Sequence, residues 1–127
     1  MATLSTDRST LKILVAEDDK ISQKLLSMLL KKISGCEPDL AETGDEASDF
    51  ARRKQYDFIF MDYNMPGCNG AEAVRMIRSD PGLSKQPYIV GLSASFGEEI
   101  DRFLSSGLDQ FMGKPISIEH IRAILSV

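Results

Sequence analysis

The stretch FIFMDYNMPGCNG, residues 58–70, largely decides the fold of this chain. Four apolar residues run directly into the carboxylate of Asp62, and Pro66 and Gly67 then break the chain. A run this short and this apolar is typical of a strand that is buried on both faces, as in parallel sheets. The stretch therefore predicts a central parallel strand with an acid at its carboxyl end.

Five strand-like segments alternate with five amphipathic helical segments. The expected strands are residues 11–16, 38–41, 56–62, 88–94 and 109–113, and the expected helices are residues 21–33, 45–54, 71–79, 98–106 and 117–125. Strands that are separated by helices pair in parallel, and right-handed crossovers place the helices on both faces. The sequence predicts one α/β domain over residues 11–127, a doubly wound (βα)5 sandwich, after a flexible N-terminal segment 1–10.

Local signals predict where the helices begin and which side is apolar. Asp19 is expected to cap the first helix, and three pairs read as capping boxes: Thr43 with Glu46, Asn69 with Glu72, and Ser95 with Glu98. On the first helix, apolar residues at helical spacing predict the apolar face: Ile21, Leu25, Met28, Leu29 and Ile33.

The composition narrows the class of protein. The 127 residues carry 15 Lys and Arg against 19 Asp and Glu, a net charge of −4. That balance argues against a nucleic-acid surface, which is normally basic. No apolar run reaches the roughly 18 residues of a membrane helix, and residues 1–10 lack the apolar core of a signal peptide. Two distant cysteines, Cys36 and Cys68, indicate reduced thiols in a cytoplasmic protein.

Acidic and polar side chains follow the expected strands at their carboxyl ends. In a doubly wound sheet, ligands bind at these ends, where the strand order reverses. The residues expected there are Glu17, Asp18 and Asp19 at the end of the first strand, Asp62 at the end of the third, Ser93 at the end of the fourth and Lys114 directly after the fifth. Asp62 is not explained as a helix cap, because the next helix starts well beyond it and has its own cap.

Such a set suits phosphate chemistry. Clustered carboxylates either shift their pKa upward or recruit a cation. Carboxylate oxygens suit Mg²⁺, which keeps several waters and completes its shell with substrate phosphate, and Mn²⁺ is the alternative ion. With the metal and Lys114 neutralising charge, Asp62 is the expected nucleophile and an acyl phosphate the product.

Four motifs in this order resemble the receiver domain of two-component response regulators: ILVAEDD, FIFMDYNMPGCNG, IVGLSA and FMGKPI. The resemblance covers residues 11–126, approximately. It implies a flavodoxin-like sheet of order 2-1-3-4-5, and an Asp that accepts a phosphoryl group from phosphohistidine of a histidine kinase or a histidine phosphotransfer protein. The segment MDYNMPGCNG resembles receivers of hybrid histidine kinases, so the chain is expected to be either free-standing or cut from such a protein.

The resemblance also implies a role for each matching residue. Asp62 matches the phosphoacceptor and is also one of the residues that bind the Mg²⁺ ion. Asp18 matches a direct Mg²⁺ ligand and Glu17 a ligand through water, while the backbone carbonyl of Asn64 matches the position that completes the metal shell. Glu17 stands where many relatives have Asp, and its longer side chain is still expected to reach the ion.

The remaining matches concern the response to phosphorylation. Lys114 matches the lysine that contacts the phosphoryl oxygens, and its bond to Pro115 is cis in the family. Ser93 matches the switch hydroxyl, with the small Ala94 after it. Phe111 matches the switch aromatic, where many relatives have Tyr, and a Phe turns inward without a hydroxyl to desolvate.

Two other functions stay open at this point. A Mg²⁺-dependent phosphohydrolase with an aspartyl-phosphate usually has an acid two residues after the nucleophile, where this chain has Asn64, a side chain that is not an acid. A receiver that has lost phosphorylation would serve only for docking, although the complete residue set argues against decay. No direct nucleic-acid or membrane binding is expected, and a phosphorylation-dependent dimer through the fourth helix, fifth strand and fifth helix stays open.

Overall fold

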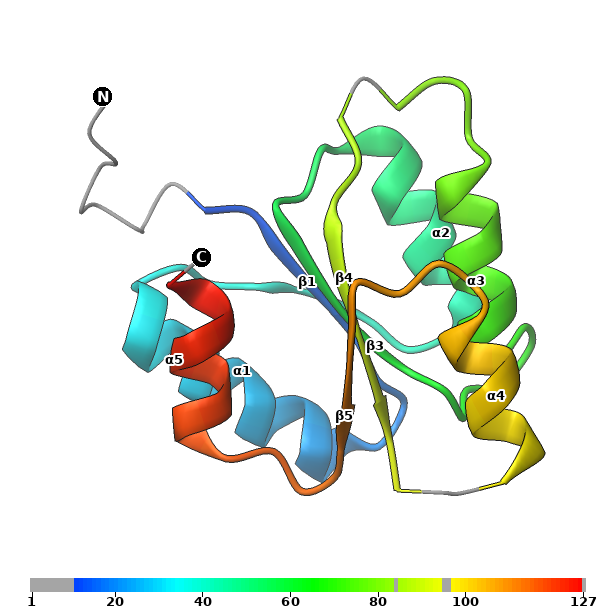
Figure 1. Ribbon diagram of the computed structural model, residues 1–127. Coiled ribbons are helices and arrows are strands. Elements are labelled where there is room, and N and C mark those ends of the chain that lie inside the picture. Colours follow the sequence, from blue (N-terminus) through cyan, green and yellow to red (C-terminus); the bar gives the residue numbers. More distant parts are fainter. Residues whose placement is uncertain (1–10, 84, 95–96, 127) are drawn as a thin grey trace.

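The computed structural model describes residues 11–83, 85–94 and 97–126, and strands and helices alternate along it (Figure 1). The N-terminal segment 1–10, expected to be flexible, lies outside the described residues. The elements are β1 (Ile13–Ala16), α1 (Lys20–Ser34), β2 (Asp39–Ala41), α2 (Gly44–Arg53), β3 (Phe58–Asp62), α3 (Gly70–Arg78), β4 (Tyr88–Ser93), α4 (Glu98–Leu104), β5 (Gln110–Gly113) and α5 (Ile118–Leu125).

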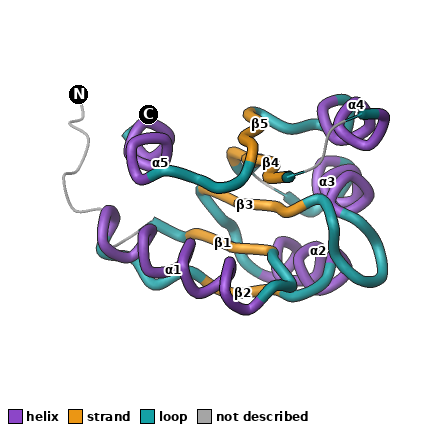
Figure 2. The backbone as a smooth tube through the Cα atoms, turned by 90° about the horizontal axis from the view of Figure 1, so that it is seen from below, coloured by secondary structure: helices purple, strands orange, loops and turns teal. Residues whose placement is uncertain are grey.

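The five strands form one parallel sheet in the order β2-β1-β3-β4-β5. Helices α1 and α5 cover one face, and α2, α3 and α4 cover the other, as Figure 2 shows from the end of the sheet. The predicted doubly wound fold and its strand order are therefore confirmed. The strand order reverses between β1 and β3, so the crevice at their carboxyl ends is where a ligand is expected.

Alternate side chains of the central strands supply two apolar cores. Ile13, Val15 and Phe60 pack under α1 and α5, while Ile59 and Met61 belong to the core under the other three helices. All residues of β3 are buried, including its final carboxylate. Burial on both faces explains the apolar run that predicted this strand, and it fixes the position of whatever follows the strand.

Polar side chains fix most helix starts as predicted. Asp19 accepts from Ser22 N at 2.9 Å at the start of α1, and Asn69 and Glu72 form a complete capping box on α3. Thr43 caps α2, but Glu46 accepts from Glu42 N instead of completing the box.

The predicted cap of α4 is wrong. Its N-cap is Gly97, with a φ of 104° and no side-chain cap hydrogen bond among the described residues. Ser95 lies outside the described residues. A glycine adopts this left-handed backbone without the clash that a Cβ atom causes, which explains why the helix starts after it.

The predicted apolar face of α1 is confirmed for Leu29 and Ile33, which pack against the core under this helix, and is wrong for the other three residues. Ile21, Leu25 and Met28 are 79%, 54% and 59% exposed, whereas the residues that α1 buries are Gln23, Leu26, Leu30 and Ser34. The helix has two apolar stripes, and the buried one includes two polar residues with partners in the backbone. Gln23 donates to Glu17 O at 3.0 Å and Ser34 to Leu30 O at 2.7 Å, so their burial costs little.

Candidate functional site

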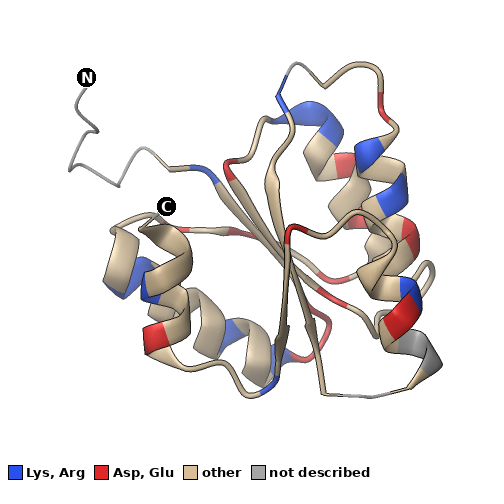
Figure 3. Ribbon diagram, in the orientation of Figure 1, with Lys and Arg blue, Asp and Glu red and all other residues tan. Residues whose placement is uncertain are grey.

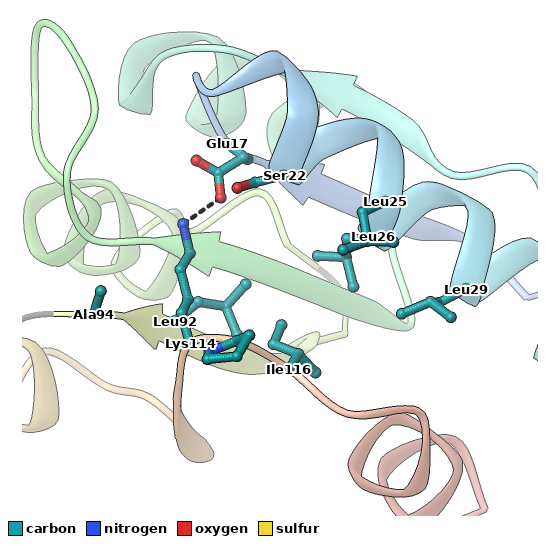
Figure 4. Close-up of a pocket in the computed structure, with 10 residues that line it drawn as sticks. Glu17, Ser22, Leu25, Leu26, Leu29, Leu92, Ala94, Lys114 and Ile116 are labelled. Atoms are coloured by element: carbon teal, nitrogen blue, oxygen red, sulfur yellow. Dashed lines mark hydrogen bonds and ion pairs between the residues drawn. The ribbon is translucent and has the colours of Figure 1, made fainter.

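Three charged side chains converge at the carboxyl ends of β1, β3 and β5. Acidic segments follow β1 and β3 at the lower edge of the sheet, with a basic segment below β5 (Figure 3). Lys114 Nζ lies 2.5 Å from Glu17 Oε1 and 3.3 Å from Asp62 Oδ1. Figure 4 shows Lys114 reaching from the end of β5 towards Glu17. Glu17 and Asp62 are only 2% and 5% exposed, so these charges interact with little screening.

Backbone hydrogen bonds beyond the strand ends hold this geometry. Glu17 N donates to Ala41 O at 2.9 Å, Tyr63 N to Leu92 O at 3.0 Å, and Lys114 N to Ser93 O at 3.0 Å. Each bond extends the parallel ladder past the end of a strand. The chain therefore positions the charged residues through the sheet itself, and not through a free loop.

Glu17, Asp18 and Asp62 could hold a metal ion. One carboxylate oxygen from each lies within 4.8 Å of the other two, with Asp18 exposed and the other two residues buried. Beside them is an open hollow of about 470 Å³ lined by Asp18, Tyr63, Asn64, Met65, Pro66 and Asn69. Hard oxygen ligands that face solvent on one side fit Mg²⁺, which takes a few carboxylates and retains several waters.

The pKa of Asp62 reflects its burial and its acidic neighbour. Burial, followed by the charge of Glu17, raises the pKa of Asp62 to about 7, and Lys114 offsets only part of the rise. A divalent cation would reverse the balance, because it favours the ionised carboxylate. Lys114 alone therefore does not cancel the effects of burial and of Glu17 on Asp62.

Lys114 is held in its charged form. Burial alone would lower the pKa of Lys114, but the hydrogen bond that Lys114 donates to Glu17 and the charges of Asp62 and Glu17 outweigh burial and raise that pKa above its ordinary value. The bond between Lys114 and Pro115 is cis. A fixed positive charge opposite Asp62 is suited to steadying negative oxygens there.

The other predicted site residues lie around this centre. Ser93 is 2% exposed on β4, one residue beyond Leu92, which is in register with Asp62 on β3. Asn64 is exposed and lines the hollow. Phe111 is half-buried on β5 in register with Gly91 and packs against Phe103 of α4. Its closest described aromatic partner is therefore on α4, away from the carboxylates.

Two features of the site were not predicted. The first is Tyr63, which lines the hollow and also packs edge-on against Phe103. Alternation along β3 was the available signal, because the residue after Asp62 turns to the opposite face of the sheet.

The second is an apolar groove of about 320 Å³ between α1 and the segment after β5. Its apolar lining is Leu25, Leu26, Leu29, Leu92, Ala94, Pro115 and Ile116, and Glu17, Ser22 and Lys114 complete it (Figure 4). The second apolar stripe of α1 was the signal for this groove in the sequence. The groove is continuous with the charged centre, because Glu17 and Lys114 belong to both.

Comparison with models of protein families matches residues 13–126 to the response regulator receiver domain. This chain belongs to that family. Among known proteins, the receiver is 33% identical over 123 residues to "Hybrid signal transduction histidine kinase G" of Dictyostelium discoideum. That match covers 95% of this chain but 4% of the relative, so the chain spans a small part of the longer protein.

Solved receiver structures have the same fold. The receiver domain of a sensor histidine kinase from Pseudomonas aeruginosa, with a magnesium ion coordinated in its active site cleft, superposes with a TM-score of 0.84 at 28% identity, covering 91% of this chain and 94% of that one. The receiver of Ssk1, crystallised with the phosphotransfer protein Ypd1 of Saccharomyces cerevisiae, superposes with a TM-score of 0.81 at 27% identity, covering 91% of this chain and 86% of that one.

None of the described helices of this receiver is long and apolar enough to span a bilayer.

Proposed function

We propose that this receiver accepts a phosphoryl group from phosphohistidine onto Asp62 in a Mg²⁺-dependent reaction. One observation carries the proposal: Asp62 is 5% exposed, shares a possible metal-binding cluster with Glu17 and Asp18, and lies 3.3 Å from Lys114. The carboxylate that accepts phosphorus thus has a cation-binding cluster on one side and a fixed ammonium on the other. The magnesium ion in the Pseudomonas aeruginosa receiver supports the choice of metal.

The proposed reaction is an in-line displacement at phosphorus. A carboxylate oxygen of Asp62 forms the new P–O bond while the P–N bond to the donor histidine breaks, and the imidazole leaves with the electron pair. Mg²⁺, when bound, supplies charge neutralisation on the phosphoryl oxygens. Asp18 and Asp62 would hold the ion, together with Glu17 through water and Asn64 through its backbone carbonyl. Lys114 donates a hydrogen bond to a phosphoryl oxygen, and this bond replaces its present contact with Asp62.

In the proposed mechanism, phosphorylation of Asp62 changes a surface of the receiver. Ser93 donates a hydrogen bond to a phosphoryl oxygen, and Phe111 turns inward as the serine moves. These shifts bias the face built by α4, β5 and α5 between two arrangements, which a partner distinguishes by its differential affinity. Phosphorylation-dependent dimerisation through this face is a further part of the proposal.

The face of α1 is proposed as the docking site for the phosphohistidine donor. All charged residues of α1 are lysines, at positions 20, 24, 31 and 32, although the whole chain has a net charge of −4. Its exposed apolar residues Ile21, Leu25 and Met28 form a ridge beside the groove that leads to Lys114. A donor must lie over the edge of the sheet beside α1 to bring its phosphorus to Asp62. We therefore expect a donor helix with an apolar centre and an acidic border, and the Ypd1–Ssk1 complex supports a phosphotransfer protein as that partner.

The phosphohydrolase alternative has less support. Asn64, which occupies the position of the usual general acid, is exposed and cannot donate a proton in that role. The proposed module is therefore not an enzyme that turns over substrates, and it loses its phosphoryl group only by slow autodephosphorylation. Both cysteines are free, which suits the proposed cytoplasmic location. We also propose that residues 11–127 form the functional unit and that the site accepts Mn²⁺ as an alternative to Mg²⁺.

Labelling experiments test the proposal. Phosphoramidate, a small phosphodonor with a P–N bond, is expected to phosphorylate the wild-type receiver with Mg²⁺, and Asp62→Asn is expected to abolish the reaction. The matched control is Asp49→Asn, at a partly exposed acid of α2 that pairs with Arg52 and Arg53. Equal labelling of the Asp62→Asn variant and the wild type contradicts the assignment.

A further inference from the structure

Three aromatic side chains form a continuous line from the charged site to the half-buried ring on β5. Tyr63 directly follows β3, Phe103 is on α4 and Phe111 is on β5. The Tyr63 and Phe103 ring centroids are 5.3 Å apart at an interplanar angle of 62°. The Phe103 and Phe111 centroids are 6.2 Å apart at 82°. Both pairs are edge-to-face, the orientation that the charge distribution of aromatic rings favours.

The middle ring has little room to move. Phe103 is 0% exposed, and it lies over Gly91 of β4. A Cβ atom at Gly91 would lie 2.9 Å from Cε2 and Cζ of Phe103 and would also meet the side chain of Leu108. Gly91 is in register with Met61 on β3 and with Phe111 on β5. The missing side chain at Gly91 therefore creates the slot in which Phe103 contacts its two aromatic neighbours.

The two ends of the line differ in freedom. Tyr63 is tied to the site, because its N–H donates to Leu92 O at 3.0 Å and its carbonyl accepts from Gly70 N at 2.8 Å. Its side chain also lines the hollow beside Asp18 and Asn64. Phe111 is half-buried, on a strand that pairs on one side with β4. A displacement of Tyr63 can therefore reach Phe111, the less constrained ring, through side chains that are in contact.

We propose that Phe103 is a positioning residue, which sets the resting place of the Phe111 ring and transmits changes beside Asp62 to it through Tyr63. The inference rests on the proposed function and deepens it, because it adds a route through α4 to the one through Ser93. An edge-to-face pair is worth enough to change the ratio of two ring positions by about fivefold. Loss of the Phe103 ring therefore changes the Phe111 equilibrium without touching the carboxylates.

The experiment uses a fluorescent reporter in place of Phe111. The chain contains no tryptophan, so Phe111→Trp introduces a single indole whose emission follows its surroundings. Beryllofluoride with Mg²⁺ serves as the phosphoryl analogue, and ¹⁹F NMR of the bound fluoride measures occupancy of the site separately. In this background Phe103→Leu, or Phe103→Met if the first variant unfolds, removes the middle ring and keeps an apolar side chain.

Phe60→Leu is the matched control. Phe60 is also 0% exposed, but it belongs to the core on the opposite face of the sheet. We expect Phe103→Leu to shift the resting emission and to reduce the response to beryllofluoride about fivefold at full occupancy. We expect Phe60→Leu to lower thermal stability and to leave the response unchanged. Tyr63→Leu, at full occupancy, is expected to reduce the response non-additively with Phe103→Leu.

Four results would overturn the inference. One is a full response in the folded Phe103→Leu variant, and another is an equal loss in Phe60→Leu, because either shows that the ring contact is not specific. The third is additivity of Tyr63→Leu and Phe103→Leu. The fourth is an emission of the Phe111→Trp parent that does not change with beryllofluoride while ¹⁹F NMR shows the fluoride bound. In that case phosphate acceptance by Asp62 stands, but the Phe111 switch and this inference both fail.

Discussion

Lys114 donates a 2.5 Å hydrogen bond to Glu17, a residue 97 positions away in the chain, and approaches Asp62 less closely, at 3.3 Å. The ammonium thus pairs mainly with the residue proposed to hold the metal through water. A phosphoryl group on Asp62 would bring new oxygens to Lys114. The resting ion pair keeps Lys114 at the site and charged until those oxygens arrive.

Removal of Lys114 tests this ion pair. Lys114→Gln leaves the buried carboxylates of Glu17 and Asp62 without their cation, so we expect a loss of roughly 3 kcal/mol in the free energy of unfolding without metal. We also expect labelling by phosphoramidate to slow by about a hundredfold. Chemical denaturation and a labelling time course measure the two effects.

Lys85→Gln provides the control for that variant. Lys85 lies 3.1 Å from Asp57, but its side chain is 63% exposed. Exposed ion pairs contribute about 0–1 kcal/mol, so this variant should stay close to the wild type in stability and labelling. Equal losses in the two lysine variants would show that Lys114 has no special role.

The raised pKa of Asp62 predicts how stability depends on pH without metal. The native carboxyl titrates at about 7 and the ordinary value is 3.8, so the native state binds more protons than the unfolded state between these values. This group therefore lowers the free energy of unfolding as pH rises through that window, and its effect is constant above it. Asp62→Asn removes the effect and is expected to raise stability at pH 8 by about 1–4 kcal/mol.

Thermal and chemical denaturation across pH 4 to 8 check this prediction. The comparison variant is Asp57→Asn, because Asp57 accepts from Lys12 N at 2.9 Å and has no place in the acidic cluster. Asp57→Asn should lower stability or leave it unchanged. A wild-type protein and an Asp62→Asn variant with parallel pH profiles would show that Asp62 carries no buried charge.

Mg²⁺ affinity should depend on the same titration. Below about pH 7 the ion must displace a proton from Asp62. We expect the apparent affinity to rise nearly tenfold per pH unit up to that point and to level off above it. Calorimetry in buffers of different ionisation enthalpy counts the released protons, and an affinity that is constant from pH 5 to 8 would exclude Asp62 as a ligand.

An acidic residue introduced on α1 tests the docking surface. Leu25→Asp puts an acid on the face of α1, where we expect repulsion from an acid-bordered donor to slow phosphotransfer at least tenfold. Labelling by phosphoramidate should not change, because that donor needs no docking surface. The measurement is the transfer rate from the phosphorylated histidine phosphotransfer protein that reacts fastest in a panel, at low and high salt.

Leu104 on α4 supplies a well-matched control. It is 52% exposed, against 54% for Leu25, and lies on the opposite face of the sheet. Leu104→Asp should transfer at the wild-type rate. Equal slowing in both variants would move the docking surface away from α1.

The sequence predicted the parts of this molecule that depend on local pattern and on topology. Alternation of short apolar runs with helices predicted the doubly wound sheet, and the position of Asp62 at the end of β3 placed it at the edge of the sheet where Glu17 and Lys114 also lie. The fold brings these residues together wherever the intervening loops run. Their separation along the chain therefore did not obscure the site.

The missed features depend on choices that side chains make between distant elements. Helix α1 has two apolar stripes, and the stripe that packs against the sheet contains Leu26 and Leu30. The contact of Phe103 with Tyr63 depends on the slot above Gly91, which involves three separate elements. Neither spacing nor composition encodes such a contact.

The phosphorylated residue is identified most directly by mass spectrometry of the receiver after reaction with phosphoramidate and Mg²⁺. Borohydride reduction of the acyl phosphate marks the modified residue before proteolysis. We predict one phosphoryl group, located on Asp62, that disappears when Mg²⁺ is removed and is absent from Asp62→Asn. A phosphoryl group on another residue, or a folded wild-type receiver that binds Mg²⁺ and takes up none, would contradict the proposed function.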